Sequence, residues 1–196
     1  MEIPYTVDER PDTGLTTPRL GIWLFLASEA MLFASLISAY VLLRGGAEFW
    51  PRQADYVNLP LALLNTGILI TSSLTMVMAW LSLKAGRLES YRIYMALTVL
   101  AGAGFLLLKA LEWSEKFAHH LYPATNNFLG IYFALTGLHI AHVVGGLLVN
   151  LVLLVTGRRV WARSPARLTG RVEVAGLYWH FVDLVWLFLF PLLYLL

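Results

Sequence analysis

The chain of 196 residues contains no cysteine and few charged residues, which make up 13% of the sequence. The absence of cysteine excludes disulfides, thiolate metal sites and cysteine nucleophiles. A soluble domain usually carries charge on about a quarter of its residues. Hydrophobic residues here make up 59% of the chain, and the mean hydropathy is +0.69. We therefore expect an integral membrane protein, with lipid rather than nucleic acid among its partners.

The first 18 residues lack both an apolar core and the arginine-rich, acid-poor composition of a transit peptide. They carry four acidic residues, so we expect neither a secretory signal peptide nor a transit peptide there. Internal repeats, low-complexity tracts and long linkers are also missing from the sequence. We predict a cytoplasmic N-terminal segment over residues 1–18 and one transmembrane domain over residues 19–196.

What the sequence does contain is five apolar blocks of about 20 residues or more, each able to cross a hydrocarbon core about 30 Å thick. The predicted spans are residues 20–43, 59–83, 93–111, 128–155 and 174–196. The sequence thus predicts an all-α bundle of five transmembrane helices. Five spans do not divide into matched halves, which disfavours an inverted-repeat transporter. A free-standing proton or small-solute transporter stays open as a minor alternative.

Lysine and arginine are distributed unevenly between the two sides of the predicted bundle. Ten of them flank the spans on the N-terminal side, and three lie on the other side. Because short cytoplasmic loops retain the excess of cations, we predict a cytoplasmic N-terminus and an external C-terminus. The most basic segment is a predicted loop over residues 158–171, which would attract anionic headgroups or an acidic partner, or act only as a topology signal.

Small residues recur at every fourth position in the first and fourth spans, a spacing that places them on one helix face. They are Ala30, Ala34 and Ser38 in the first span, and Gly137, Ala141 and Gly145 in the fourth. Such stripes allow helices to approach closely in lipid. We expect both stripes to pack within a tight bundle.

Ionisable residues inside the predicted spans are the main functional candidates. Glu29 and Asp183 should lie at similar depth, where a carboxylate needs a partner, a proton or water. His180 precedes Asp183 by three residues, so the two side chains could form a hydrogen bond, and His139 and His142 repeat that spacing. These residues indicate a proton path, a ligand site or a satisfied polar network that fixes helix register. For the histidines the network is favoured, and a haem or metal centre is least favoured.

Two charged residues end the third span close to the predicted outer surface. Glu112 lies one turn after Lys109, and this spacing predicts an intrahelical ion pair near the membrane interface. We expect the Lys109 side chain to reach toward the headgroups. Tyr194 and other aromatic residues near span ends are expected in an interfacial belt.

Four segments together resemble subunit III of the haem–copper terminal oxidases, in its short bacterial form of five helices. They are FLASEAMLFASLISAYVLLR, LPLALLNTGILITSSLT, TGLHIAHVVGG and the closing span YWHFVDLVWLFLFPLLYLL. The last is long and specific to the family, and all five spans are covered by the resemblance. The mitochondrial form has seven helices, and this chain is similar to the form that lacks the first two. Lys109 and Trp113 stand where the family usually has Gln and Tyr.

The resemblance implies a subunit of a cytochrome c or quinol oxidase that reduces O₂ to water and pumps protons in a bacterial plasma membrane. Haem and copper would lie in partner subunits, with no catalytic residue or metal ligand in this chain. It would pack on subunit I, with subunit II and a small subunit IV as further partners, and support proton uptake and catalytic lifetime. The main alternative is a subunit-III-like protein associated with nitric oxide reductase, which the full WHFVDLVWLFLF ending disfavours.

The resemblance also implies roles for individual residues. Glu29 corresponds to the carbodiimide-reactive acid of the longer forms, and the polar network would comprise Glu29, His139, His142, His180 and Asp183. The family binds phospholipid in a cleft between helix groups. The residues expected near lipid headgroups are Arg44, Glu112, Arg158, Arg159 and Arg163.

Overall fold

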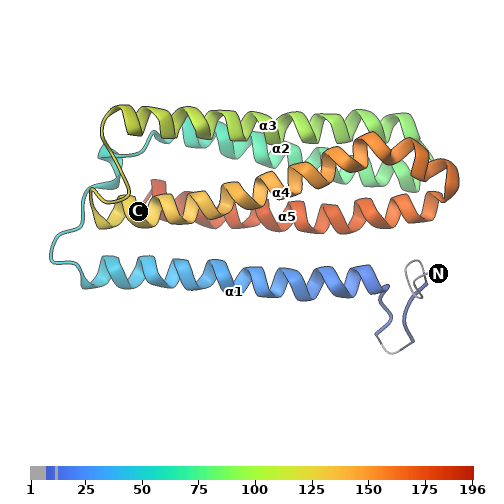
Figure 1. Cartoon of the computed structure of the whole chain (residues 1–196), viewed down its shortest axis with the longest axis horizontal. Coiled ribbons are helices and arrows are strands. Elements are labelled where there is room, and N and C mark those ends of the chain that lie inside the picture. Colours follow the sequence, from blue (N-terminus) through green and yellow to red (C-terminus); the bar gives the residue numbers. More distant parts are fainter. Residues whose placement is uncertain (1–7, 12) are drawn as a thin grey trace.

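A computed structural model describes residues 8–11 and 13–196, and the regular structure of these residues is helical (Figure 1). The elements are, in chain order, α1 (Thr17–Gly46), the short 3-10 helix η1 (Gln53–Asp55), α2 (Leu59–Lys84), α3 (Leu88–Ala118), α4 (Asn127–Arg163) and α5 (Pro165–Tyr194). Five of these helices are long and apolar enough to cross a membrane, which confirms the predicted all-α architecture. Residues 1–7 and 12 lie outside the described part, so the predicted division between residues 1–18 and 19–196 stays a prediction.

The helices extend beyond the predicted apolar spans, most of all where α4 meets α5. The sequence predicts a loop over residues 158–171, but Ser164 alone separates the two helices, so that prediction is wrong. Hydropathy marks only the part of a helix inside hydrocarbon, whereas these helices continue past it. Ser164 has an extended backbone and accepts a hydrogen bond from the Arg167 N–H at 3.4 Å. Pro165 follows at the first helical position, where its fixed φ suits the start of a helix.

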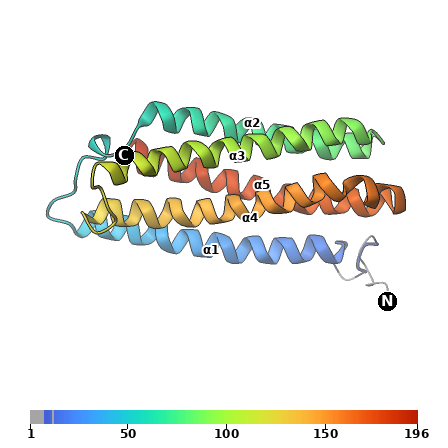
Figure 2. The same ribbon diagram turned by 45° about the horizontal axis from the view of Figure 1, so that its top comes forward.

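The helices form a bundle of four, α2 to α5, with α1 along its side (Figures 1 and 2). Helix α2 pairs closely with α3, and α5 packs against both α2 and α4. Helix α1 packs mainly on α4 and α5. Only 11% of the most apolar stretch of α1 is buried, against 44% of that of α5. Helix α1 is therefore the peripheral helix of the isolated chain.

The centre of the bundle is built around Trp179 of α5, whose side chain is fully buried. Gly102 and Gly146 leave the space that the indole occupies, because a Cβ atom at either position would lie 2.8 Å from the ring. The indole N–H donates a hydrogen bond to Ser72 Oγ at 3.0 Å. Three helices thus meet this ring of α5: α2 supplies the serine, and α3 and α4 each supply one of the glycines that admit it.

The two stripes of small residues have different surroundings. In the α4 stripe, Gly137 lies against the Trp113 ring and Gly145 lies near the Tyr178 hydroxyl. In the α1 stripe, Ala30, Ala34 and Ser38 are all exposed. The prediction that the α1 stripe packs within the bundle is wrong, because α1 presents its other face to α4 and α5.

Candidate functional site

Glu29 of α1 and His142 of α4 form the polar contact at the middle of the seam between these helices. Glu29 Oε2 lies 2.8 Å from His142 Nε2, and the side chains are 16% and 12% exposed. The other ring nitrogen, Nδ1, lies 2.8 Å from the Leu138 carbonyl oxygen, which can only accept a hydrogen bond. The Phe33 ring packs on the imidazole at 5.1 Å between centroids. The structure thus supplies a partner for Glu29 that lies 113 residues away in the sequence.

The hydrogen bonds of His142 define how many protons the pair holds. Because Nδ1 donates to the Leu138 carbonyl, Nε2 of a neutral ring has no proton of its own. The contact with Glu29 then needs one further proton, carried either by the imidazole as a cation or by the carboxylic acid. The pair can therefore hold a proton inside the membrane without net charge.

The predicted hydrogen bond between His180 and Asp183 is not formed. His180 Nδ1 instead lies 2.7 Å from Ser73 Oγ of α2. Asp183 is 6% exposed, and its two carboxyl oxygens have no hydrogen-bond partner among the described residues. Helical spacing brings the two side chains onto one face, but the imidazole forms its hydrogen bond with the Ser73 hydroxyl of α2 instead. The pairing prediction is wrong for this reason.

His139 lies apart from the contact between Glu29 and His142, although it was predicted to belong to the same polar network. Its ring is fully buried between Phe105 and Trp186, with centroid distances of 5.6 Å and 5.1 Å. Neither ring nitrogen has a hydrogen-bond partner in the described part of the chain. The five residues of the predicted polar network therefore occupy three separate places, and only His142 contacts Glu29.

A second polar cluster lies near the end of the bundle that is opposite to the start of α5. Lys109 Nζ lies 2.8 Å from Glu112 Oε2, so the predicted ion pair is confirmed. The pair is enclosed, however, with side chains 1% exposed, and the expectation that Lys109 reaches toward the headgroups is wrong. The Tyr132 and Tyr194 hydroxyls donate hydrogen bonds to Glu112 Oε1 at 2.7 Å and 3.0 Å. Lys116 lies 3.5 Å from the same carboxylate oxygen.

This enclosure corrects two further predictions. Glu112 is buried and has no surface to offer a lipid headgroup. Tyr194 is 5% exposed and belongs to the cluster, not to an interfacial belt. The sequence held one signal for this arrangement: a lysine stands at position 109 within an apolar run, and a buried lysine needs both an acid and hydroxyl partners.

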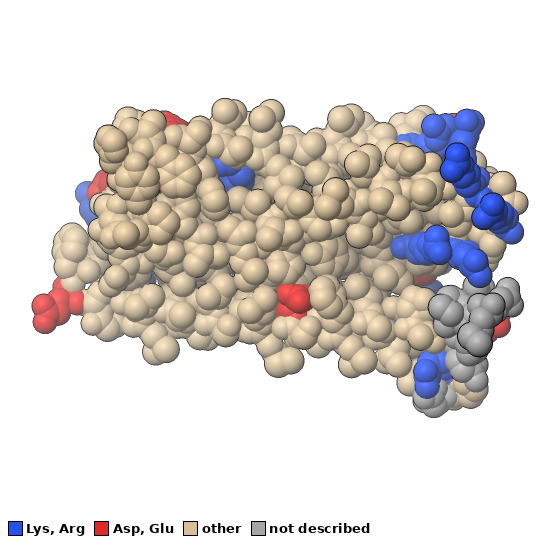
Figure 3. Space-filling view, in the orientation of Figure 1, with Lys and Arg blue, Asp and Glu red and all other residues tan. Residues whose placement is uncertain are grey.

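The arginines predicted near headgroups lie at both ends of the bundle. Arg44 donates hydrogen bonds to the Tyr40 hydroxyl and to the Leu196 carbonyl, at 2.9 Å and 3.0 Å. At the opposite end, Arg158 pairs with Glu89 at 3.0 Å. Arg159 and Arg163 are exposed near the end of α4 and have no ion-pair partner among the described residues. Figure 3 shows Lys and Arg gathered at the end where α5 begins, beside a broad and almost uncharged lateral surface.

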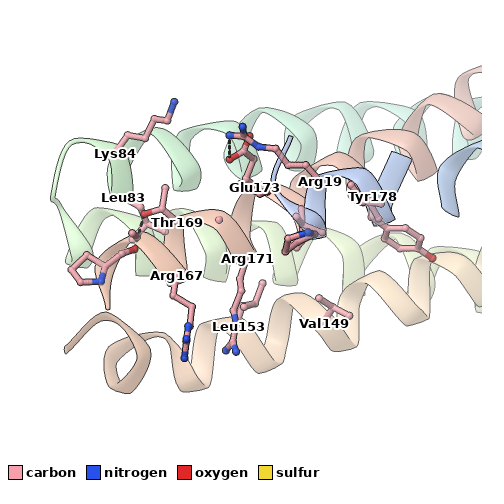
Figure 4. A pocket seen from close by; sticks show the side chains of 18 of the residues that line it. Arg19, Leu83, Lys84, Val149, Leu153, Arg167, Thr169, Arg171, Glu173 and Tyr178 are labelled. Atoms are coloured by element: carbon pink, nitrogen blue, oxygen red, sulfur yellow. Dashed lines mark hydrogen bonds and ion pairs between the residues drawn. The ribbon is translucent and has the colours of Figure 1, made fainter. Parts of the chain in front are cut away.

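A cavity of about 1230 Å³ opens at this basic end, between the start of α1 and helices α4 and α5 (Figure 4). Val149 and Leu153 of α4 line its apolar part. Arg167 and Arg171 extend in the same direction from one face of α5 (Figure 4). The cavity thus combines an apolar wall with guanidinium groups, which is the chemistry that an anionic amphiphile requires.

Across this cavity, Arg19 of α1 and Glu173 of α5 form an ion pair at 2.7 Å. The pair ties the start of α1 to the bundle beside the cavity (Figure 4). The described residues, 8–11 and 13–196, contain no group of three or more His, Asp or Glu side chains that could hold a metal ion.

Comparison with known proteins agrees with the resemblance found in the sequence. The profile of the family described as cytochrome c oxidase subunit III matches residues 12–196. The chain belongs to the cytochrome c oxidase subunit III family. It is 39% identical to cytochrome c oxidase subunit 3 of Alkalihalophilus pseudofirmus, over 90% of this chain and 85% of that protein. It is 34% identical to cytochrome bo(3) ubiquinol oxidase subunit 3 of Pseudomonas aeruginosa, over 100% of this chain and 92% of that protein.

Another relative, the cytochrome c oxidase subunit 3 of Thermostichus vulcanus, is 37% identical over 96% of this chain and 90% of its own length. Membership of this family and the five spanning helices confirm that this subunit III is a multi-pass protein of the bacterial plasma membrane. It is a subunit of a respiratory terminal oxidase, which is an oxidoreductase complex. The oxidase hypothesis is confirmed, and the nitric oxide reductase alternative loses its support.

Proposed function

We propose that this subunit III packs on the haem–copper subunit I of a proton-pumping oxidase, supports proton uptake during reduction of O₂ to water, and prolongs the catalytic lifetime of the complex. Haem and copper belong to the partner subunits, and this chain contributes no redox centre. Subunit II and a small subunit IV are further partners. A copper-binding subunit II in the purified complex would identify cytochrome c as the electron donor, and its absence would indicate quinol.

The observation that carries the proton-uptake role is the contact between Glu29 and His142. The pair holds one proton in a hydrogen bond of 2.8 Å, and both side chains keep some exposure at the lateral surface. A proton held at a partly exposed site can exchange with a neighbouring group, whereas the enclosed Glu112 cluster cannot offer one. Of these two acids, Glu29 is therefore the one suited to proton transfer.

The charge distribution supports the proposed orientation. Most of the lysines and arginines lie at the end where α1 and α5 begin. Because the cytoplasmic side retains such residues, this end faces the cytoplasm, and the C-terminus lies outside. Proton uptake takes place from the cytoplasm, so the basic end and the cavity lie on the uptake side.

The cavity beside Arg167 and Arg171 supports phospholipid binding. Its apolar wall would take an acyl chain, and the two guanidinium groups would bind the phosphate of the headgroup. The same end of the bundle also carries Arg158, Arg159 and Arg163. These arginines would add electrostatic attraction to anionic lipid. Arg44, at the opposite end, would meet headgroups of the outer leaflet.

The test is the replacement of Glu29 by Gln in the complete oxidase. We expect normal assembly, slower proton uptake and faster loss of activity during turnover. His142→Gln should have the same effects, because it removes the other half of the pair. Glu115→Gln is the matched control, since Glu115 is an exposed acid near the end of α3. Wild-type proton uptake and lifetime in Glu29→Gln would reduce the pair to a packing contact.

A further inference from the structure

His180 and Ser73 form a polar spot on the side of the bundle, where α5 meets α2. Ser73 Oγ lies 2.7 Å from His180 Nδ1, and both side chains are half-buried. The other ring nitrogen, Nε2, makes no hydrogen bond to any described residue and is not among the enclosed atoms. Asp183, one turn further along α5, is nine-tenths buried and has two carboxyl oxygens without partners in the described chain. The chain alone therefore leaves hydrogen-bonding capacity unused at this spot.

The polar spot lies about midway along two of the helices that are long and apolar enough to cross the membrane. His180 is near the midpoint of α5, and Ser73 is near the midpoint of α2. At 1.5 Å per residue, His180 is roughly 20 Å from either end of its helix. Acyl chains offer neither donors nor acceptors at this depth. A polar group that faces sideways there needs a polypeptide opposite it.

Apolar side chains surround the polar spot. Ile70 and Val77 lie on α2 at helical spacing from Ser73, and they are 46% and 39% exposed. Leu184 lies one turn after His180 on α5 and is 51% exposed. We refer to these five residues as the α2–α5 face. It has the composition of an intramembrane contact: an apolar surface for packing with one polar group at its centre.

Other parts of the lateral surface differ from this face. The outward side of α3 presents only apolar side chains at comparable depth, as Leu100 and Leu107 show with 67% and 63% exposure. Such a surface suits acyl chains. Glu29 also reaches the lateral surface, but His142 satisfies it within the chain. In the described part of the chain, the α2–α5 face is therefore a place where an outward-facing polar group lacks a partner.

We propose that a transmembrane helix of the haem–copper subunit packs on the α2–α5 face and places a hydrogen-bonding side chain opposite His180. The inference rests on the proposed function, because it assigns a surface to the partner named there. A hydroxyl or carboxamide group of the partner fits the position, since it can donate to or accept from either tautomer of His180. The surrounding apolar residues pack against the same helix and exclude lipid from the contact.

The test is site-specific photo-crosslinking in the complete oxidase, with a tag on the haem–copper subunit. The photoreactive residue benzoylphenylalanine replaces Leu184 in one variant and Leu107 in the control. Both positions are exposed, and both lie the same number of residues after the start of helices that begin on the same side. We expect at least about tenfold more crosslinked haem–copper subunit from position 184 than from position 107.

Equal crosslinking from the two positions, or crosslinking from position 107 alone, would overturn the proposal. So would crosslinks from position 184 that reach only lipid or a second copy of this chain. Co-purification of the unlabelled chain with the tagged subunit tests the proposed function separately. If the chain co-purifies but crosslinks from the wrong face, the proposed function stands and this inference fails.

A second experiment tests the same contact by enlarging a side chain instead of crosslinking it. Leu184→Trp enlarges an exposed side chain within the α2–α5 face, and Leu107→Trp makes the same change on α3. Because both side chains face outward, neither change disturbs the core of the isolated chain. We expect Leu184→Trp to lower the amount of this chain retained on the tagged subunit by about tenfold and Leu107→Trp to leave it unchanged. Equal retention of the two variants contradicts the proposal.

Discussion

Glu112 and Glu29 are both acids within an apolar bundle, yet they differ in their exposure and in the number of their partners. Glu112 has two lysines and two tyrosine hydroxyls around it and is closed off from the surface. Glu29 has a single imidazole and keeps some exposure at the seam between α1 and α4. Removal of the enclosed and fully partnered carboxylate is therefore expected to destabilise the fold, whereas the carboxylate at the seam is the one that we propose to exchange its proton.

The largest expected effect comes from removing the carboxylate of the enclosed cluster. Glu112→Ala leaves the charges of Lys109 and Lys116 without their acid, and breaking a buried pair in this way costs about 3–5 kcal/mol. We expect a large fall in the free energy of unfolding, measured by titration with a denaturing detergent. Glu115→Ala removes an exposed acid of the same helix and should leave it nearly unchanged. Equal stabilities of the two variants would contradict the comparison.

A smaller loss is expected from Lys109→Gln, which replaces the cation by a carboxamide. The amide is neutral and shorter, so Glu112 keeps Lys116 and the tyrosines but loses its closest cation. We expect a loss of roughly 1–3 kcal/mol in the same unfolding titration. A loss as large as that of Glu112→Ala would mean that Lys116 contributes nothing to the cluster.

Glu29→Gln should change stability still less. Hydrogen bonds between transmembrane helices contribute about 0.6 kcal/mol on average, and the amide can keep a contact with His142. The effect should appear in proton uptake by the complete oxidase, while the unfolding free energy falls by less than in Lys109→Gln. A loss of stability similar to that of Glu112→Ala would mean that Glu29 contributes to stability as much as Glu112 does, which would contradict the comparison.

The smallest effect on the isolated chain is expected from Asp183→Asn. Neither carboxyl oxygen of Asp183 has a hydrogen-bond partner in the described structure, so no contact is lost. We expect a change within about 0.5 kcal/mol in the unfolding titration. A substantial loss of unfolding free energy would support the pairing with His180 that the helical spacing suggested.

The sequence predicts the five helices because each apolar run is long enough to cross the hydrocarbon as a helix. It does not predict where α4 ends or where α5 begins, because the two helices continue beyond the hydrocarbon and hydropathy no longer marks them. Spacing within one helix predicts the contact between Lys109 and Glu112 and equally one between His180 and Asp183. Only the first forms, since Ser73 from another helix binds the histidine.

Contacts between distant segments explain the other differences. Glu29 and His142 lie 113 residues apart, and no local pattern relates them. The exposure of the Ala30, Ala34 and Ser38 stripe depends on which face of α1 turns toward the bundle, and small residues alone do not define that face. The kinds of residue that matter could be read from the sequence, but their partners on other helices could not.

The close fit of Trp179 to Gly102 and Gly146 has a consequence for engineering the bundle. A methyl group at either glycine would meet the indole at 2.8 Å, so the three positions are matched in size. Libraries that vary them one at a time should yield only damaged proteins, because each enlargement overpacks a full core. Joint variation, with a smaller ring paired to a larger neighbour, is the route by which a repacked centre could be recovered.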